Sequence, residues 1–462
     1  MIFRRIVPPV LICAGLIGCA PFNWYRTDLH ACAGTDPASL HVKCEENTVQ
    51  VLQPASVDLP GYVLGFIEFD DQGQLWSRDQ MYAVLKSVDV QTSDGTADYL
   101  MVVFVHGWKH NAGIEDTNVA NFRGALTQLS ATEIALSQKV GRPARKVIGI
   151  YLGWRGASLT TPVIENLTFW DRKNTAHKVG HGEVTEVLDR LDLIRQKRIA
   201  RDSGSHSRLI VVGHSFGGAV VFSALEQILE SRFDHSVGTP DNPTAVQGLG
   251  NLVVLINPAF EAQLYAPLSD LSTEQRSYVR SQLPVLAILT SEADDATGIA
   301  FPIGRWFSTR FEKQRPAERN NPIANSKEII NQKQSDIYAI GHFEPYRTHS
   351  LRALQVPSVP TPTTDLAQSA RQNAMALAMT SQQWEDDVPG GEIAFPGSVL
   401  KRTENSAGRD PYLVIKVDKT LIKDHNDIWR PGIRDFITNL ILISSQSNNL
   451  KERAEHRQAA AK

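Results

Sequence analysis

A serine between two glycines is the residue of this sequence whose surroundings best suit a nucleophile. The segment Gly213-His214-Ser215-Phe216-Gly217 follows an apolar run at 209–212 and precedes an apolar stretch with helical spacing. A serine on a tight turn between a strand and a helix projects its Oγ from the sheet, and flanking glycines let the two elements approach closely. The amides of the first helical turn point to the same place, where they favour negative charge. The pattern predicts that Ser215 is a nucleophile; the competing interpretation is a structural turn serine.

The elements that must position this serine form an alternating series. Apolar runs at 62–69, 99–105, 146–152, 251–256, 283–290 and 412–417 have the character of buried strands, and segments such as 116–129, 183–200 and 431–444 have helical periodicity. Strands that alternate with helices predict an α/β fold with a doubly wound, mostly parallel sheet. In such a sheet the carboxyl ends of the strands meet at one edge, where catalytic groups gather.

A second junction between strand and loop strengthens the pattern at Ser215. The run that begins at Tyr99 ends in His106-Gly107-Trp108, for which a plain turn is the alternative interpretation. With the serine segment and with the phrases at 104–112 and 290–294, this junction makes the chain resemble α/β-hydrolases of the serine esterase and lipase type, including a largely uncharacterised microbial subgroup. The resemblance covers residues 60–446. It implies an oxyanion hole made by the backbone N–H groups of Phe216 and Trp108, with His106 shaping the loop.

The resemblance also implies where the acid of a catalytic triad stands. A serine hydroxyl needs a histidine to accept its proton and a carboxylate to orient that histidine, and in this fold the chain order is serine, acid, histidine. The acid is expected in a loop after a strand beyond Ser215. Asp294 fits that place best, in Ser291-Glu292-Ala293-Asp294-Asp295. Asp295 and Glu292 are alternatives, and a solvated acidic turn is the interpretation without function.

The histidine is a choice among three positions. His425 follows the last apolar run and precedes the final amphipathic helix, which is where the fold places its base. His342, in Gly341-His342-Phe343, is the main alternative, and His349 is a third. We favour His425, because choosing His342 leaves a strand and a helix after the catalytic loop without a role.

The amino-terminal residues predict export and a lipid anchor. A positive start and an apolar run at 6–17 lead into Leu16-Ile17-Gly18-Cys19, which resembles the lipobox of bacterial lipoproteins. That resemblance implies cleavage before Cys19 and acylation of this cysteine, and Ala20 after it favours the outer membrane. An ordinary secretory signal is the alternative. Of four cysteines, Cys32 and Cys44 then remain as a pair in an oxidising compartment, and we expect them to form a disulfide.

The domain organisation follows from these elements. We expect a signal peptide at 1–18, an irregular tether at 19–60, a hydrolase domain at 61–446 with an insertion at about 301–398 before the last strand, and a polar tail at 447–462. With 47 Lys and Arg against 50 Asp and Glu, the net charge is −3, so the composition shows no excess of positive charge that would indicate nucleic-acid binding. No cysteine or histidine spacing suggests a metal site, and the expected chemistry needs no cofactor.

Two hypotheses for function come from different classes. The first is a membrane-anchored serine hydrolase of the cell envelope that cleaves small-molecule or lipid carboxylic esters through Ser215, Asp294 and His425. The second is a surface lipoprotein that uses a hydrolase scaffold for binding, with catalysis incidental or lost. Labelling of Ser215 by a fluorophosphonate discriminates between them.

Overall fold

The computed structural model describes residues 23–54, 60–92, 97–156, 169–239, 242–275, 277–323, 325–354, 365–387, 391–404 and 406–447. Cys19, the expected signal peptide, most of the polar tail and the Pro/Thr-rich run at 357–364 lie outside these residues. Among the helices described, none is long and apolar enough to cross a bilayer.

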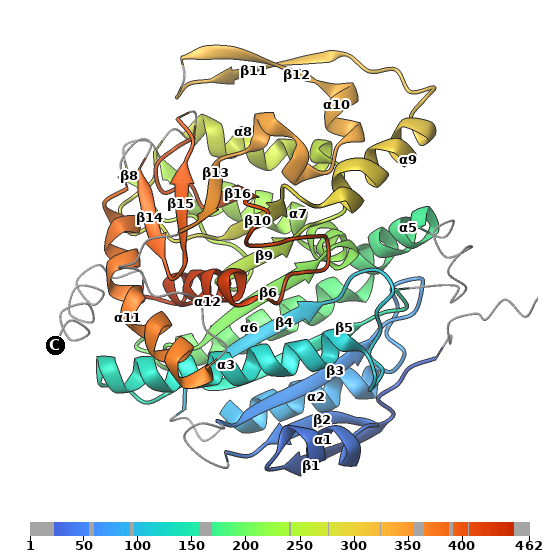
Figure 1. The fold of residues 1–462 in the computed structure, drawn as a ribbon, viewed down its shortest axis with the longest axis vertical. Helices are drawn as coiled ribbons and strands as arrows, with labels where there is room; N and C mark the ends of the chain where they lie inside the picture. Colours follow the sequence, from blue (N-terminus) through green and yellow to red (C-terminus); the bar gives the residue numbers. More distant parts are fainter. Residues whose placement is uncertain are drawn as a thin grey trace, which may run out of the picture.

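A twelve-stranded sheet forms the centre of the molecule (Figure 1). From β3 to β13 the strands all run parallel, whereas β2 pairs antiparallel with β3, and β15 pairs antiparallel with β13 and β14. The predicted α/β class with a mostly parallel sheet is confirmed. The order across the sheet is β1 (Asp28–Gly34), β2 (Asn47–Leu52), β3 (Tyr62–Glu68), β5 (Lys146–Gly153), β4 (Tyr99–Val105), β6 (Arg208–His214), β9 (Leu252–Ile256), β10 (Leu286–Ser291), β16 (Tyr412–Val417), β13 (His349–Ala353), β15 (Ser398–Arg402) and β14 (Glu392–Phe395).

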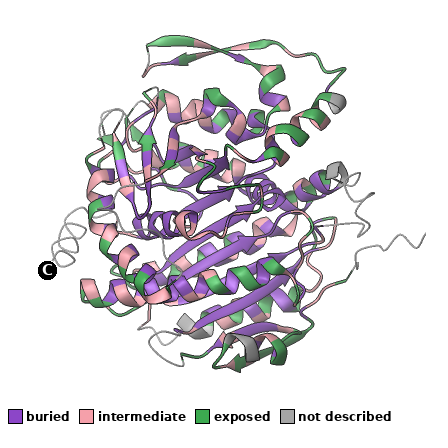
Figure 2. Cartoon of the chain, in the orientation of Figure 1, coloured by how far each residue is buried: buried purple, intermediate pink, exposed green. Residues whose placement is uncertain are grey.

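Helices cover both faces of this sheet, which explains why its central strands are apolar throughout. Along β4, Met101 and Val103 join one hydrophobic cluster, while Val102 and Phe104 join the other. Figure 2 shows these strands as buried. The first cluster includes side chains of α2 (Arg78–Thr92), α5 (Phe169–Val179), α6 (Thr185–Arg201), α7 (Phe216–Ser236) and α8 (Ala266–Gln275). The second includes side chains of α1 (Pro37–Lys43), α3 (Thr117–Val140), α11 (Leu366–Glu385) and α12 (Pro431–Ser444).

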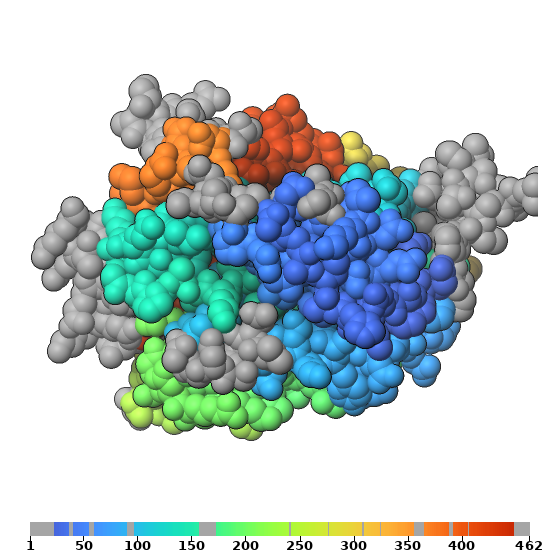
Figure 3. Space-filling model, turned by 90° about the horizontal axis from the view of Figure 1, so that it is seen from below, coloured from blue at the N-terminus to red at the C-terminus, as the bar shows by residue number. Residues whose placement is uncertain are grey.

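The structure departs from the irregular tether expected before residue 60. Residues 28–52 form β1, α1 and β2, which extend the sheet and make part of the surface seen from below, in dark blue (Figure 3). Cys32 and Cys44 form the predicted disulfide. The segment is polar because β1 is an edge strand whose side chains are mostly exposed. It therefore lacks the apolar run of a buried strand.

The segment at 301–398 is likewise more ordered than its sequence indicates. Its first part forms α9 (Phe301–Ser308), the hairpin β11 (Pro316–Asn321) and β12 (Ser326–Asn331), and α10 (Gln332–Ile337). Its second part supplies β13, α11 and β14, and together with β15 these extend the main sheet beyond β16. Amphipathic edge strands of four or five residues are hard to recognise without their partners.

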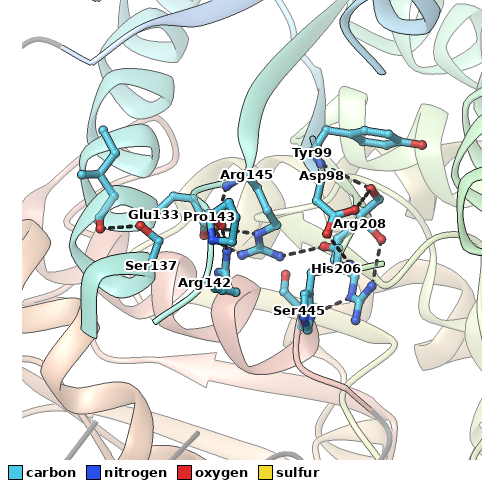
Figure 4. A network of polar contacts seen from close by, with 12 residues as sticks. Asp98, Tyr99, Glu133, Ser137, Arg142, Pro143, Arg145, His206, Arg208 and Ser445 are labelled. Atoms are coloured by element: carbon cyan, nitrogen blue, oxygen red, sulfur yellow. Dashed lines mark hydrogen bonds and ion pairs between the residues drawn. The ribbon is translucent and has the colours of Figure 1, made fainter. Parts of the chain in front are cut away.

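A buried polar network closes the amino ends of the central strands (Figure 4). Arg145, just before β5, donates from Nε and Nη2 to both carboxylate oxygens of Glu133 on α3, at 2.9 and 2.7 Å. Asp98, before β4, accepts from the hydroxyl of Ser207 at 2.9 Å. Arg208, at the start of β6, donates to the carbonyl of Ser445 after α12 at 3.0 Å. The network therefore ties three strands to two helices at the edge opposite Ser215.

Candidate active site

Five adjacent parallel strands, β4, β6, β9, β10 and β16, end at the edge where the predicted site residues lie. Register pairs Val105 of β4 with Gly213 of β6, and Ser291 of β10 with Val417 of β16. The loops after these strands therefore leave the sheet side by side, although they are far apart in sequence. The structure brings Ser215, Asp294 and His425 together at this edge.

Ser215 stands on a strained turn at the start of α7. Its backbone has φ 56° and ψ −121°, a conformation that a residue with a side chain rarely adopts and that costs about 1–3 kcal/mol. Backbone hydrogen bonds hold it there: its N–H donates to Ile256 O at 3.0 Å, and its carbonyl accepts from the N–H of Ala259 at 3.1 Å. A Cβ on Gly217 would lie 2.1 Å from Val105 O, so this position excludes any side chain.

The three side chains form a continuous hydrogen-bonded series. His425 Nε2 lies 2.6 Å from Ser215 Oγ, and His425 Nδ1 lies 2.8 Å from Asp294 Oδ1. A carboxylate only accepts, so Nδ1 carries the proton and Nε2 is left to accept from the serine hydroxyl. Ser215 and Asp294 are buried, and the His425 side chain is 17% exposed. The His425 ring is thus the most exposed of the three side chains.

Asp294 is kept ionised by its neighbours. Burial by itself raises the pKa of this carboxyl, but the His425 ring and the two hydrogen bonds from Thr297 hold the pKa below its usual value. Thr297 donates from its hydroxyl to Oδ2 and from its backbone N–H to Oδ1, the latter at 3.1 Å. A charged acid is what fixes the tautomer of the histidine and stabilises it when it takes a proton.

His342, the main alternative base, lies one residue further along this series. Its Nε2 is 3.0 Å from Thr297 Oγ1. Because the Thr297 hydroxyl donates its proton to Asp294, the same oxygen accepts from His342. Burial lowers the pKa of His342. His342 therefore reaches Asp294 through Thr297, and its ring contacts the Thr297 hydroxyl, whereas the ring of His425 contacts Ser215.

The remaining candidates have other partners. His349 opens β13, is buried, and holds Thr348 Oγ1 at 2.8 Å; burial lowers its pKa to about 3. Glu292 pairs with Lys416 at 2.8 Å, and Asp295 is exposed. Among the six acids and histidines that the sequence offered, Asp294 and His425 are the two that contact each other and lead to Ser215.

Two residues that sequence reasoning missed hold the loop of His425. The carbonyl of His425 accepts from His214 Nε2 and from Asn257 Nδ2, each at 2.9 Å. Asn257 Oδ1 in turn accepts from the N–H of Ser291 at 2.9 Å, which joins the ends of β9 and β10. Burial first, and then the His425 ring, lower the pKa of His214 to about 3, so its ring is neutral. The signal available in the sequence was the position of these residues: His214 is the last residue of β6, and Asn257 directly follows β9.

The expected oxyanion loop packs directly on the turn of Ser215. A Cβ on Gly107 would lie 2.8 Å from Ser215 Cβ and 3.0 Å from His214 O, so Trp108 follows a residue that packs against Ser215. Phe216 is the first residue of α7, whose amino end faces the same place. These positions suit the predicted roles of the Trp108 and Phe216 amides, which stay a prediction.

His106 has a structural role in this loop. Its Nε2 accepts from the N–H of Trp154 at 3.0 Å, and its Nδ1 donates to Gly107 O at 2.9 Å. The Trp154 indole donates to His106 O at 3.0 Å, and the two rings are stacked with centroids 5.7 Å apart. Burial lowers the pKa of His106 to about 4, which keeps the ring neutral. Both ring nitrogens are thus occupied in shaping the loop.

Among the described residues, no group of three His, Cys, Asp or Glu side chains is arranged to hold a metal ion.

Comparison with known proteins gives one partial likeness. No protein-family profile matches the sequence, and no curated protein matches it. A solved structure that matches is the phospholipase PlaB from Legionella pneumophila in complex with thio-NAD, with 13% identity and a TM-score of 0.21. The match covers 55% of this chain and 45% of that phospholipase, so the likeness spans less than half of the other protein. At this TM-score the likeness carries no argument about activity.

Proposed function

We propose that the protein is a serine hydrolase that cleaves carboxylic esters of small molecules or lipids. One observation carries the proposal: Ser215 Oγ lies 2.6 Å from His425 Nε2, while Asp294 occupies the other ring nitrogen at 2.8 Å. This arrangement makes the serine hydroxyl a nucleophile and supplies the base that accepts its proton. The strained turn and its glycines support the same role, because such a turn projects the serine hydroxyl from the end of the strand toward the histidine.

The reaction would proceed in two balanced halves. Ser215 Oγ attacks the ester carbonyl carbon while its proton passes to His425 Nε2. The tetrahedral intermediate collapses when that proton moves to the leaving alcohol, which leaves an acyl group on Ser215. Water then attacks the acyl-enzyme with His425 again as the base, and the acid product departs with the serine restored. Asp294 stabilises the imidazolium in both halves, and no cofactor takes part.

The negative charge of each intermediate needs hydrogen-bond donors in place beforehand. We assign this role to the backbone N–H groups of Phe216 and Trp108, which belong to the two segments packed at Ser215. A pair of preorganised donors of this kind contributes about 3–4 kcal/mol of transition-state stabilisation per donor.

Anchoring to a membrane is a separate part of the proposal and rests on the sequence alone. Leu16-Ile17-Gly18-Cys19 supports acylation at Cys19 in the cell envelope, with the outer membrane favoured by Ala20. Radioactive palmitate should be incorporated into the wild-type chain and lost in Cys19→Ser. Incorporation that persists in Cys19→Ser would remove the anchor from the proposal without touching the catalytic part.

A fluorophosphonate probe tests the catalytic proposal. The wild-type protein should be labelled covalently, and Ser215→Ala should not. Ser223→Ala is a matched control, because Ser223 is a buried serine whose Oγ also lies near a histidine ring, 2.8 Å from His177 Nδ1, but on the second turn of α7. It should keep full labelling.

Hydrolysis of p-nitrophenyl esters with short and long acyl chains provides a second readout. Activity should disappear in Ser215→Ala and stay in Ser223→Ala. A wild-type protein that is neither labelled nor active would favour a binding protein built on a hydrolase scaffold.

A further inference from the structure

The segment that follows the Asp294 loop builds a surface unlike the rest of the molecule. In Figure 1, α9 and the β11–β12 hairpin form the top of the molecule, beyond the sheet. One face of α9 is fixed to the protein: Phe301 is fully buried, and Arg305 pairs with Glu261 at 2.8 Å and with Asp336 at 2.5 Å. The other face is therefore held in a defined direction, toward solvent.

Large apolar side chains are exposed on that outer side. Ile303 and Trp306 of α9 are exposed, and Ile299 precedes them by one turn. Phe311, just after α9, is 90% exposed, and Ile329 on β12 is 72% exposed. Figure 2 shows the hairpin and this helix mostly as exposed or intermediate. Single exposed apolar residues are ordinary, but this segment holds five within about thirty residues of chain, and two of them, Trp306 and Ile329, line the same groove.

Positive charge surrounds these apolar side chains. Residues 299–333 contain seven Lys or Arg and three Glu, in a chain whose net charge is −3. A groove of about 530 Å³ opens here, lined by Trp306 and Ile329 together with Arg310, Arg315 and Lys333. Glu312 is the acidic residue of its lining. Within the described part of the chain, Arg310, Arg315 and Lys333 form no ion pair, so their charges are available to an anion.

We propose that this surface docks the protein on an anionic lipid membrane. The basic-apolar patch comprises Ile299, Ile303, Trp306, Phe311, Ile329, Arg310, Arg315 and Lys333. Phe311, Ile303 and Trp306 enter the boundary between head groups and acyl chains, and the three cations of the groove hold lipid phosphates. An amphipathic surface with aromatic and aliphatic residues beside Lys and Arg is what binds in the plane of an anionic bilayer.

Charge complementarity is the reason for choosing a lipid surface over a second copy of the chain. A copy would bring the same excess of cations to the interface, and like charges across an interface cost free energy. A bilayer with acidic lipids supplies many phosphates in a plane and an apolar layer beneath them. The inference goes beyond the proposed hydrolysis and does not depend on it, since binding needs neither Ser215 nor His425.

Binding to vesicles tests this proposal. The full chain carrying Cys19→Ser is mixed with vesicles of phosphatidylcholine alone, or of phosphatidylcholine with 30% phosphatidylglycerol, and the bound fraction is measured by flotation. The Cys19→Ser substitution removes the acyl anchor. The apolar segment at 6–17 is the same in every variant, so it does not cause differences in binding between them. We expect about tenfold or greater preference for the acidic vesicles at low salt, lost in 0.5 M NaCl.

Two sets of variants locate the binding surface. Arg310→Gln/Arg315→Gln/Lys333→Gln should remove the preference for acidic vesicles. The matched control Lys43→Gln/Lys86→Gln/Lys197→Gln changes the net charge equally at exposed positions on α1, α2 and α6, and should keep the preference. Ile303→Ser/Phe311→Ser should weaken binding to both kinds of vesicle at least about fivefold. All these positions are exposed, so the thermal midpoint should stay within a few degrees and exclude misfolding.

Several outcomes would overturn the proposal. Equal binding of the starting protein to both kinds of vesicle would do so. So would a control variant Lys43→Gln/Lys86→Gln/Lys197→Gln whose preference for acidic vesicles falls as much as that of Arg310→Gln/Arg315→Gln/Lys333→Gln. Self-association through the patch, seen by light scattering without vesicle binding, would point to a second copy. Ser215→Ala should bind vesicles like the starting protein, so a failed hydrolase proposal leaves this inference standing, and the reverse also holds.

Discussion

The two ends of the parallel strands carry buried polar networks that differ in what they hold. At the amino ends, the carboxylate of Glu133 pairs with both Arg145 and Arg142. At the carboxyl ends, the carboxylate of Asp294 is bound by His425 and Thr297, and the series continues from the His425 ring to the Oγ of Ser215. The first network joins groups of opposite charge, whereas the second ends at a serine hydroxyl beside a histidine nitrogen. The second is therefore the candidate site for chemistry, and the first has a structural role.

The pKa values reflect the same difference. Burial by itself raises the pKa of Glu133, but the two guanidinium groups outweigh it and lower the pKa to about 2. Asp294 also lies below its usual pKa, held there by the His425 ring and Thr297. The partner of Glu133 is permanently charged, while the partner of Asp294 can gain and lose a proton. Only the second pair can take part in proton transfer.

The largest effect should come from removing the reactive end. His425→Ala should lower kcat/KM for a p-nitrophenyl ester by about 10⁴-fold or more, because His425 is the base that Ser215 Oγ contacts among the described residues. The free energy of unfolding in urea should change by less than about 1 kcal/mol, since the His425 side chain is partly exposed. A variant that keeps full activity would refute the assignment of His425.

For the network at the amino ends of the strands, we expect a large effect on stability and a small effect on activity. Glu133→Gln leaves the buried cation of Arg145 without its counter-charge and should lower the free energy of unfolding by about 3–5 kcal/mol. The kcat/KM of the folded protein should stay within about twofold. Glu392→Gln is the control: it breaks an exposed pair with Arg352 at 2.7 Å and should cost about 1 kcal/mol or less. Loss of activity without loss of stability in Glu133→Gln would contradict the structural role that we give to this network.

The stabilisation by Glu133 should depend on pH in a defined direction. Its folded pKa of about 2 lies below the usual 4.5, so the folded state favours the ionised form. The stabilisation is fully present above pH 4.5 and is lost as the pH falls toward about 2. The difference in unfolding free energy between wild type and Glu133→Gln should be equal at pH 7 and 6 and smaller at pH 3. A difference that grows on acidification would be inconsistent with this pair.

A smaller effect is expected at the second layer of the candidate site. Thr297→Val preserves shape but removes the hydroxyl that donates to Asp294 Oδ2 and accepts from His342. Losing a hydrogen bond to a charged group should lower kcat by about 10-fold to 100-fold, with KM little changed. Thr290→Val is the matched control, because the Thr290 hydroxyl is buried and has no hydrogen-bond partner among the described residues. It should leave kcat unchanged.

The smallest effect should come from the other histidine. His342→Ala should reduce kcat/KM by less than about fivefold, because His342 reaches Asp294 only through Thr297. Comparison with His425→Ala in the same assay separates the two loops. Equal losses in both variants would mean that the hydrogen-bonded series acts as one unit.

How much of the fold and of the candidate site could be predicted from the sequence depends on whether neighbouring residues alone specify each feature. The turn of Ser215 is specified within about ten residues, by an apolar strand, two glycines and the helix that follows. The central parallel strands were equally readable, because a strand buried on both faces is an unbroken apolar run. The outer strands β1, β13, β15 and β14 were not, because the pattern of such short strands becomes meaningful only beside a neighbouring strand.

The sequence by itself therefore determined the α/β class, the central strands, the turn of Ser215, and Asp294 as the leading acid. Only the tertiary structure decided that His425, and not His342 or His349, is the histidine between them. It also brought in Thr297, His214 and Asn257, which hold Asp294 and the loop of His425. The physical reason is distance along the chain: Ser215 and His425 are 210 residues apart, and a contact of 2.6 Å between them exists only once the parallel strands lie side by side.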